Sequence, residues 1–131
     1  TDNIVHVRRG GDIDIGFRSW AGSHRHVIAG NVLTVDPGGK CALAMDIRGF
    51  GAVVTGNHMH TANADMPLRL LITGGNTLVT GNMFENVVIE VNDKTGAGKP
   101  IVVNNNLMEQ SRIEHRAGAL VPPLATTAPA R

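Results

Sequence analysis

Aromatic residues and cysteine are scarce in this chain of 131 residues. It has no tyrosine, one tryptophan and three phenylalanines, which leaves few side chains for stacking against a sugar ring. The single cysteine, Cys41, excludes an internal disulfide and a cysteine-ligated structural zinc site. No apolar run approaches the roughly 20 residues that a membrane-spanning helix needs, so we expect no membrane insertion.

An excess of charge of either sign is also missing. Twelve Lys and Arg residues oppose 11 Asp and Glu residues, and a net charge of +1 argues against a nucleic-acid-binding protein. Apolar residues make up 42% of the chain, which is enough for one modest domain with a core of Val, Ile, Leu and Met. The 16 glycines favour short strands joined by tight turns over a helical bundle.

An internal repeat is the strongest feature of the sequence. Four segments share the pattern apolar-x-Gly-Asn-x-apolar, at residues 27–33, 53–59, 78–84 and 102–108. Their asparagines lie 26, 25 and 24 residues apart. In the last copy Asn105 replaces the glycine, a change that fits because asparagine tolerates a left-handed backbone better than most residues.

A second apolar segment follows each copy of the repeat. These segments cover residues 41–47, 67–73, 87–92 and, more weakly, 111–115. An earlier half-copy at residues 12–17 follows a strand-like segment at residues 4–7. A unit of two or three short strands cannot bury its own apolar side, but stacked units can. The sequence therefore predicts an all-β solenoid with few helices.

The Val-x-Gly-Asn-x-Met copies resemble the repeat common to pectate lyases, polygalacturonases and phage tailspikes. This resemblance covers roughly residues 3–116 and implies a right-handed parallel β-helix with about 25 residues per coil and about four to five coils. We expect a β-helix domain at residues 1–116 and an Ala, Pro and Thr-rich tail or cap at residues 117–131. Because the repeat occurs in enzymes and non-enzymes alike, the resemblance specifies architecture rather than activity.

Stacking of the coils places equivalent residues above one another. It predicts a structural ladder of asparagine side chains at the corners, formed by Asn31, Asn57, Asn82 and Asn106. It also predicts columns of core side chains. These are Ile28, Val54, Val79 and Val103; Leu33, Met59, Phe84 and Met108; and Met45, Leu70, Ile89 and Ile113.

The outer side of the first strand in each copy is unexpectedly apolar. Its residues are Val27, Val53, Leu78 and Val102. One interpretation is that exposed strands tolerate valine because of its strand propensity. The other is that this strip is an interface with another subunit or with a larger parent chain. Both interpretations stay open at the level of sequence.

Enzymes with this architecture usually act on acidic polysaccharides, with charged residues on an outer strand face. The comparable set here is Arg69, Glu90 and Arg112, which we expect to stack on successive coils and which could bind a carboxylate sugar. Cross-strand ion pairing explains the same residues without any ligand. The paired aspartates and the Gly-His-Gly motif of polygalacturonases are absent, so we predict no catalytic residue.

Six histidines include two pairs at positions i and i+2. One pair is His24 and His26, and the other is His58 and His60. Such pairs can chelate zinc or copper, but a typical site needs a third ligand, and the two pairs do not align on one coil position. We therefore predict no metal site and no cofactor.

The leading functional hypothesis is a non-catalytic structural β-helix that self-associates or packs in a larger assembly such as a fibre, spike or surface filament. The apolar strip and the lack of an obvious capping helix motivate it. The alternative is a fragment of a carbohydrate-active or carbohydrate-binding β-helix. We expect a homo-oligomer or larger assembly as the partner, or a polysaccharide under the alternative, and an extracellular or surface location.

Overall fold

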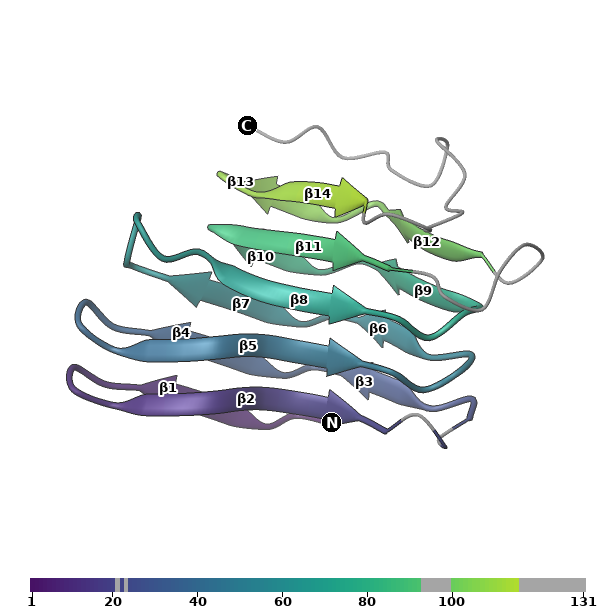
Figure 1. Cartoon of the computed structure of the whole chain (residues 1–131), viewed down its shortest axis with the longest axis horizontal. Helices are drawn as coiled ribbons and strands as arrows, with labels where there is room; N and C mark the ends of the chain where they lie inside the picture. The colour runs from purple at the N-terminus through teal and green to yellow at the C-terminus, as the bar shows by residue number, and fades with distance from the viewer. Residues whose placement is uncertain (21, 23, 93–99, 116–131) are drawn as a thin grey trace.

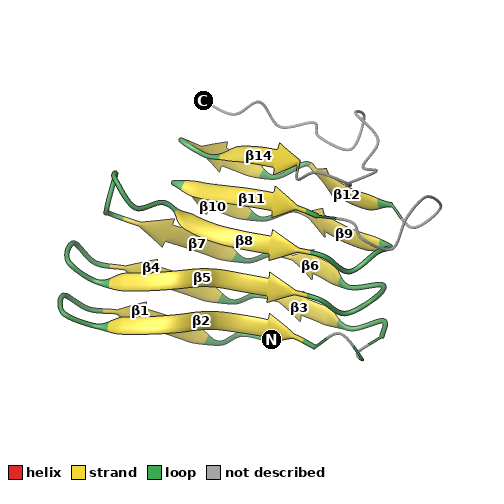
Figure 2. Ribbon diagram, in the orientation of Figure 1, coloured by secondary structure: helices red, strands yellow, loops and turns green. Residues whose placement is uncertain are grey.

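The computed structural model describes residues 1–20, 22, 24–92 and 100–115. Within these residues the chain forms fourteen β-strands and no helix (Figure 2). All the strands pair in parallel, in three sheets. The prediction of an all-β parallel solenoid is confirmed.

Each of the first four turns contributes one strand to each of three sheets, which are numbered in chain order. Within the described residues, β13 and β14 add a fifth strand to sheets 1 and 2 only. Sheet 1 contains β1 (Ile4–Val7), β4 (Val32–Val35), β7 (His58–Thr61), β10 (Met83–Glu85) and β13 (Leu107–Glu109). Sheet 2 contains β2 (Asp12–Ser19), β5 (Lys40–Ile47), β8 (Leu68–Ile72), β11 (Val87–Val91) and β14 (Arg112–His115). Sheet 3 contains β3 (Val27–Ala29), β6 (Val53–Thr55), β9 (Thr77–Thr80) and β12 (Ile101–Asn104).

The turns rise regularly from the first strands to the last. In Figure 1 the strands of sheet 2 run to the right at the front, and the chain returns to the left behind them while it climbs. This path is right-handed, as predicted. There are about 4 turns of about 25 residues each, at the lower end of the predicted four to five.

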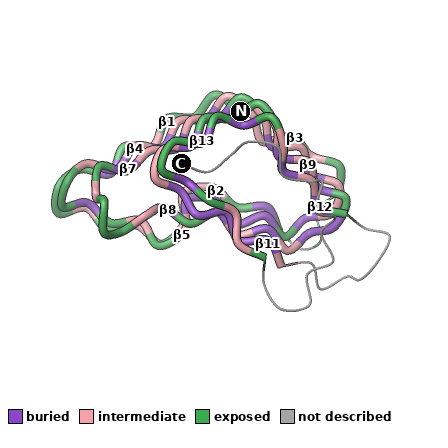
Figure 3. The backbone as a smooth tube through the Cα atoms, turned by 90° about the horizontal axis from the view of Figure 1, so that it is seen from above, coloured by how far each residue is buried: buried purple, intermediate pink, exposed green. Residues whose placement is uncertain are grey.

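The core is the inside of the coil, where the buried segments lie when the solenoid is viewed along its axis (Figure 3). Strand pairing places Leu33, Met59, Phe84 and Met108 in one column. It places Met45, Leu70, Ile89 and Ile113 in a second column and Ile28, Val54, Val79 and Val103 in a third. All three predicted core columns are confirmed, and only Ile28 and Ile113, at their ends, are partly exposed.

The corner between sheet 3 and sheet 1 is the most regular part of each turn. The residue before each ladder asparagine has a positive φ angle of 66–69° at Gly30, Gly56 and Gly81 and of 53° at Asn105. Glycine adopts this conformation without steric cost, and asparagine is among the few other residues that accept it. The predicted equivalence of Asn105 to the glycines is therefore confirmed.

The sequence predicted two or three strands in each repeating unit, and the structure has three. The segment at residues 4–7 and the half-copy at residues 12–17 belong to a complete first turn, formed by β1, β2 and β3. The predicted tail at residues 117–131 lies outside the described residues.

Candidate functional site

The four asparagines expected to form a ladder lie at the corner between sheets 3 and 1 and are only 1–6% exposed. In each of Asn31, Asn57 and Asn82 the backbone N–H and the side-chain amide both donate to the Oδ1 atom of the next asparagine, at 2.9–3.0 Å. The amide of Asn106 donates to the carbonyl of Val79 at 3.0 Å. Polar groups at this buried corner are thus hydrogen-bonded, which gives these side chains a structural role.

Asn3 extends the ladder at its lower end, which the sequence did not indicate. Its backbone N–H and its side-chain amide both donate to Asn31 Oδ1 at 3.0 Å. Asn3 is not preceded by glycine and is not part of a full copy of the repeat, so only its spacing of 28 residues from Asn31 could have pointed to it.

The apolar strip consists of Val27, Val53, Leu78 and Val102 on the outer face of sheet 3. Strand pairing places the four side chains directly above one another. Val27 is 56% exposed, and the other three are partly exposed. A second column on the same face contains Ala29, Thr55, Thr80 and Asn104. Neither column contains a charged residue, so this face is uncharged and partly apolar.

A second outer column with apolar members lies on sheet 1, and the sequence analysis missed it. It contains Ile4, Val32, His58, Met83 and Leu107. Ile4 is 79% exposed and Leu107 56% exposed. The signal was available, because the residue after each ladder asparagine must point outward when the following residue points into the core.

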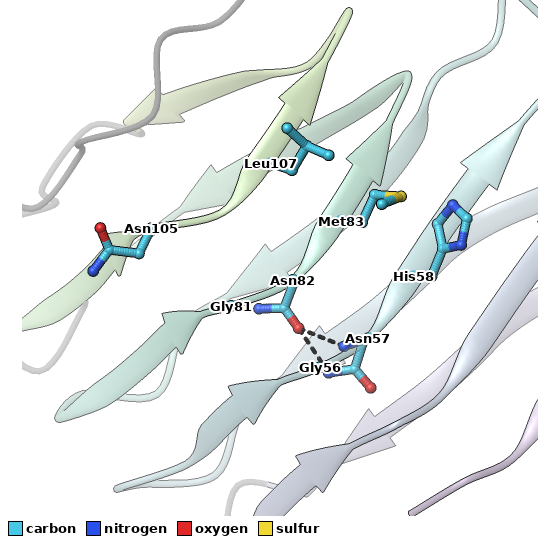
Figure 4. A pocket seen from close by; sticks show the side chains of 8 residues that line it. All are labelled: Gly56, Asn57, His58, Gly81, Asn82, Met83, Asn105 and Leu107. Carbon is cyan, nitrogen blue, oxygen red and sulfur yellow. Dashed lines mark hydrogen bonds between the residues drawn. The ribbon is translucent and has the colours of Figure 1, made fainter.

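A shallow groove of about 450 Å³ runs along the corner beside this column (Figure 4). It is lined by three positive-φ residues, two ladder asparagines and three members of the outer column of sheet 1: Gly56, Gly81 and Asn105; Asn57 and Asn82; and His58, Met83 and Leu107. The groove is open and contains a single titratable side chain, that of His58. Its chemistry suits contact with another surface better than catalysis.

The charged cluster on sheet 2 brings Arg69, Glu90 and Arg112 into one pocket of about 260 Å³, together with Glu114. Arg69 Nε donates to Glu90 Oε2 at 2.5 Å, and Arg112 Nε donates to Glu114 Oε2 at 2.6 Å. Glu90 is almost fully buried, whereas the two arginine side chains are about half exposed. The pocket therefore contains both acidic and basic groups, and each arginine already binds a carboxylate.

The prediction that these three residues stack directly is wrong. Val88 lies between Arg69 and Arg112 in the strand register, while Glu90 pairs with Leu71 on one side and Glu114 on the other. Glu90 therefore reaches Arg69 diagonally across the face of sheet 2. The three side chains still share one pocket because Val88 and Glu90 lie two residues apart and face the same way.

A second charged group lies lower on the same face. Asp46 is fully buried and accepts two hydrogen bonds from Arg48 Nε, at 3.0 and 3.1 Å. Arg18 lies 3.4 Å from the same carboxylate and stacks over the ring of Trp20 at 4.8 Å. Trp20 is 63% exposed, which makes it the one large aromatic surface beside this cluster.

The two histidine pairs differ in their surroundings. His58 and His60 face outward from β7, and both approach Glu85 on the neighbouring β10. His24 packs against Phe50, and neither ring nitrogen of His26 has a hydrogen-bond partner. Among the residues that the structure describes, no group of three or more His, Cys, Asp or Glu side chains is arranged so that it could hold a metal ion.

Cys41 lies in β5, partly buried against the core. Burial raises the pKa of its thiol from 9.0 to about 11, against the lowering effect of hydrogen bonds with the backbone of Gly16 and Leu43. A thiol with so high a pKa stays protonated at neutral pH and is a poor nucleophile. Cys41 is therefore a packing residue.

Comparison with known proteins assigns no family. The chain matches no protein-family model, no curated protein and no solved structure. No helix among the described residues is long and apolar enough to cross a membrane. Functional conclusions therefore depend on the geometry of the chain's own residues.

Proposed function

We propose that this protein is a non-catalytic structural β-solenoid that associates side by side with further copies of itself through the apolar strip of sheet 3. The observation that carries the proposal is the alignment of Val27, Val53, Leu78 and Val102 in one uncharged outer column. The outward side chains on a water-exposed sheet face are normally charged or polar, whereas all four in this column are apolar.

A second copy fits this surface because the two would share the same spacing. Equivalent side chains in stacked parallel strands lie about 4.8 Å apart, so the side chains of one column can pack into the gaps of another. The net charge of +1 creates little repulsion between copies. The neighbouring column of Thr55, Thr80 and Asn104 supplies polar groups at the rim, as protein interfaces usually have.

The sequence resemblance to pectate lyases, polygalacturonases and tailspikes supports a place for the chain within that architectural superfamily. Within it, the structural role of a tailspike fits the described residues better than the catalytic role of a lyase. The carboxylates of Asp46, Glu90 and Glu114 are each bound by arginine, and the corner groove contains no acid pair.

Sedimentation of the purified chain at rising concentration tests the proposal. We expect the apparent mass to increase with concentration for the wild type and to stay monomeric for the double variant Val53→Lys, Leu78→Lys. Ala42→Lys is the control, because it adds a lysine at an exposed position of sheet 2, away from the apolar strip. A wild type that stays monomeric at high concentration, or a double variant that still associates, would contradict the proposal.

A second candidate function is the binding of an acidic polysaccharide on sheet 2. The pocket that contains Arg69 and Arg112 favours it, because two guanidinium groups are well suited to carboxylates. We expect an oligouronate to bind to the wild type and not to the double variant Arg69→Ala, Arg112→Ala. An unchanged sheet 2 NMR spectrum on addition of the oligouronate would exclude this function.

A further inference from the structure

We infer that His58, His60 and Glu85 form a binding site for a divalent transition-metal ion of the zinc type on the outer face of sheet 1. His58 and His60 lie on β7, two residues apart and on one face. Glu85 lies on β10 and pairs with His60 in the strand register. The turn above thus supplies the third ligand that a histidine pair on one strand lacks.

Both histidines approach the same oxygen atom of Glu85, at different distances. Nε2 of His58 forms an ion pair with Oε2 of Glu85, and Nδ1 of His60 lies 3.9 Å from the same oxygen. A separation of 3.9 Å is too long for a hydrogen bond. Nδ1 of His60 is buried and has no hydrogen-bond partner. A nitrogen that could bind a metal ion therefore lies near the carboxylate without a bond to it.

A metal ion between these groups would satisfy all three. Zinc binds histidine nitrogen and carboxylate oxygen at about 2.0–2.2 Å in tetrahedral geometry, which separates the donor atoms by about 3.4 Å. Ion binding therefore requires Glu85 to move away from His58 and towards His60. The three side chains are 34–43% exposed, so they have room to rotate, and rotation is what brings the buried Nδ1 of His60 to an ion that enters from solvent.

The neighbouring charges also favour a cation. Glu109 on β13 lies directly above Glu85 in the strand register. Like charges opposite one another on neighbouring strands are destabilising, and a bound cation offsets them. Glu109 is exposed and lies beside the site, where it could supply a fourth ligand in place of water.

The donor set selects the class of metal. Two imidazoles and one carboxylate suit zinc, copper or nickel, whereas magnesium and calcium prefer sites built from oxygen alone. The site lies on sheet 1, apart from the apolar strip, and does not depend on self-association.

Calorimetric titration of the metal-free chain with zinc chloride tests the inference. We expect one ion per chain, with affinity reduced by at least roughly tenfold in Glu85→Gln and in His60→Ala. The double variant His24→Ala, His26→Ala is the matched control, because it removes the other histidine pair and should leave affinity unchanged. Circular dichroism of each variant verifies that it is folded.

Cobalt absorption in the visible region provides a second readout that reports the ligands directly. We expect a tetrahedral spectrum in the wild type that is lost in Glu85→Gln. The inference is overturned if no saturable binding occurs, if Glu85→Gln binds as well as the wild type, or if the control variant loses the binding instead.

Discussion

Asn82 makes as many ladder hydrogen bonds as Asn57 does. Its Oδ1 atom accepts from the backbone N–H and from the side-chain amide of Asn57, and its own amide donates to the carbonyl groups of Val54 and Thr80 and to Asn106. These bonds join three successive turns at one buried corner. The side chain of Asn82 provides the hydrogen bonds that these buried groups would otherwise make with water.

Replacement of Asn82 by alanine should therefore be costly. It removes the acceptor of the buried N–H of Asn57 and a donor to the carbonyl of Val54, and an unsatisfied buried group costs about 1–3 kcal/mol. We expect the free energy of unfolding to fall by about 2–4 kcal/mol, measured by urea denaturation. Asn104→Thr is the control, since its neighbour in the outer column is Thr80, and its effect should stay within about 0.5 kcal/mol. Equal losses in both variants would contradict a structural role for the ladder.

Spacing alone was sufficient to identify the ladder asparagines but not to place the charged side chains. The corner has two residues in every turn, so its members can be aligned from sequence. The connection from sheet 1 to sheet 2 varies from residues 62–67 after β7 to residue 86 alone after β10. Despite that variation, the predicted core column of Leu70, Ile89 and Ile113 fixes the register of sheet 2. It places Val88, rather than Glu90, beside Arg69 and Arg112, so the expected charged stack was inconsistent with that core column.

The strand β10 shows the alternation of faces within a single element. Phe84 is fully buried in the core column, while Met83 is 38% exposed beside the corner groove. Phe84 is also the bulkiest of the fully buried side chains and lies between Met59 and Met108. The two adjacent residues of β10 thus provide a matched pair of substitutions.

Phe84→Ala should lower the free energy of unfolding by about 3–5 kcal/mol, because it opens a cavity between two packed turns. Met83→Ala should change it by less than about 1 kcal/mol, because the side chain already contacts solvent. Thermal or urea denaturation of the two variants measures the difference. Similar values for both would mean that β10 does not present Phe84 to the core.

At the level of the element, the alternation of apolar residues predicted the core columns of all three sheets. It did not predict that Val88 and Glu90, which face away from the core, are nearly fully buried. Periodicity identifies the face on which a side chain lies, but it carries no information about what covers that face. The third ligand for His58 and His60 was missed for a related reason, since Glu85 comes from another turn.

The described part of the molecule is a stack in which the strands of each turn pair with those of the neighbouring turns. Strands of the first turn, such as β2, pair on one side within the described residues, whereas β8 pairs on both sides. Stability in such a stack is a sum of contributions from turns and from the interfaces between them. Opening from the ends should therefore require less free energy than opening of the middle.

Amide hydrogen exchange should show this gradient. We expect the amides of β7 and β8 to exchange at least roughly tenfold more slowly than those of β1 and β2. Mass spectrometry of exchanged peptides under native conditions measures the ratio. Uniform protection along the chain would show that the solenoid opens as a single cooperative unit instead.

The constant two-residue corner has a consequence for changes in chain length. Residues 30–31, 56–57, 81–82 and 105–106 restart each turn at the same point, whatever the length of the preceding connections. An insertion between β7 and β8 is therefore absorbed within its own turn, and the strands above keep their register. Residues 62–67 are accordingly the position at which foreign sequence can be displayed on this scaffold, whereas a single added residue at the corner would displace every turn that follows.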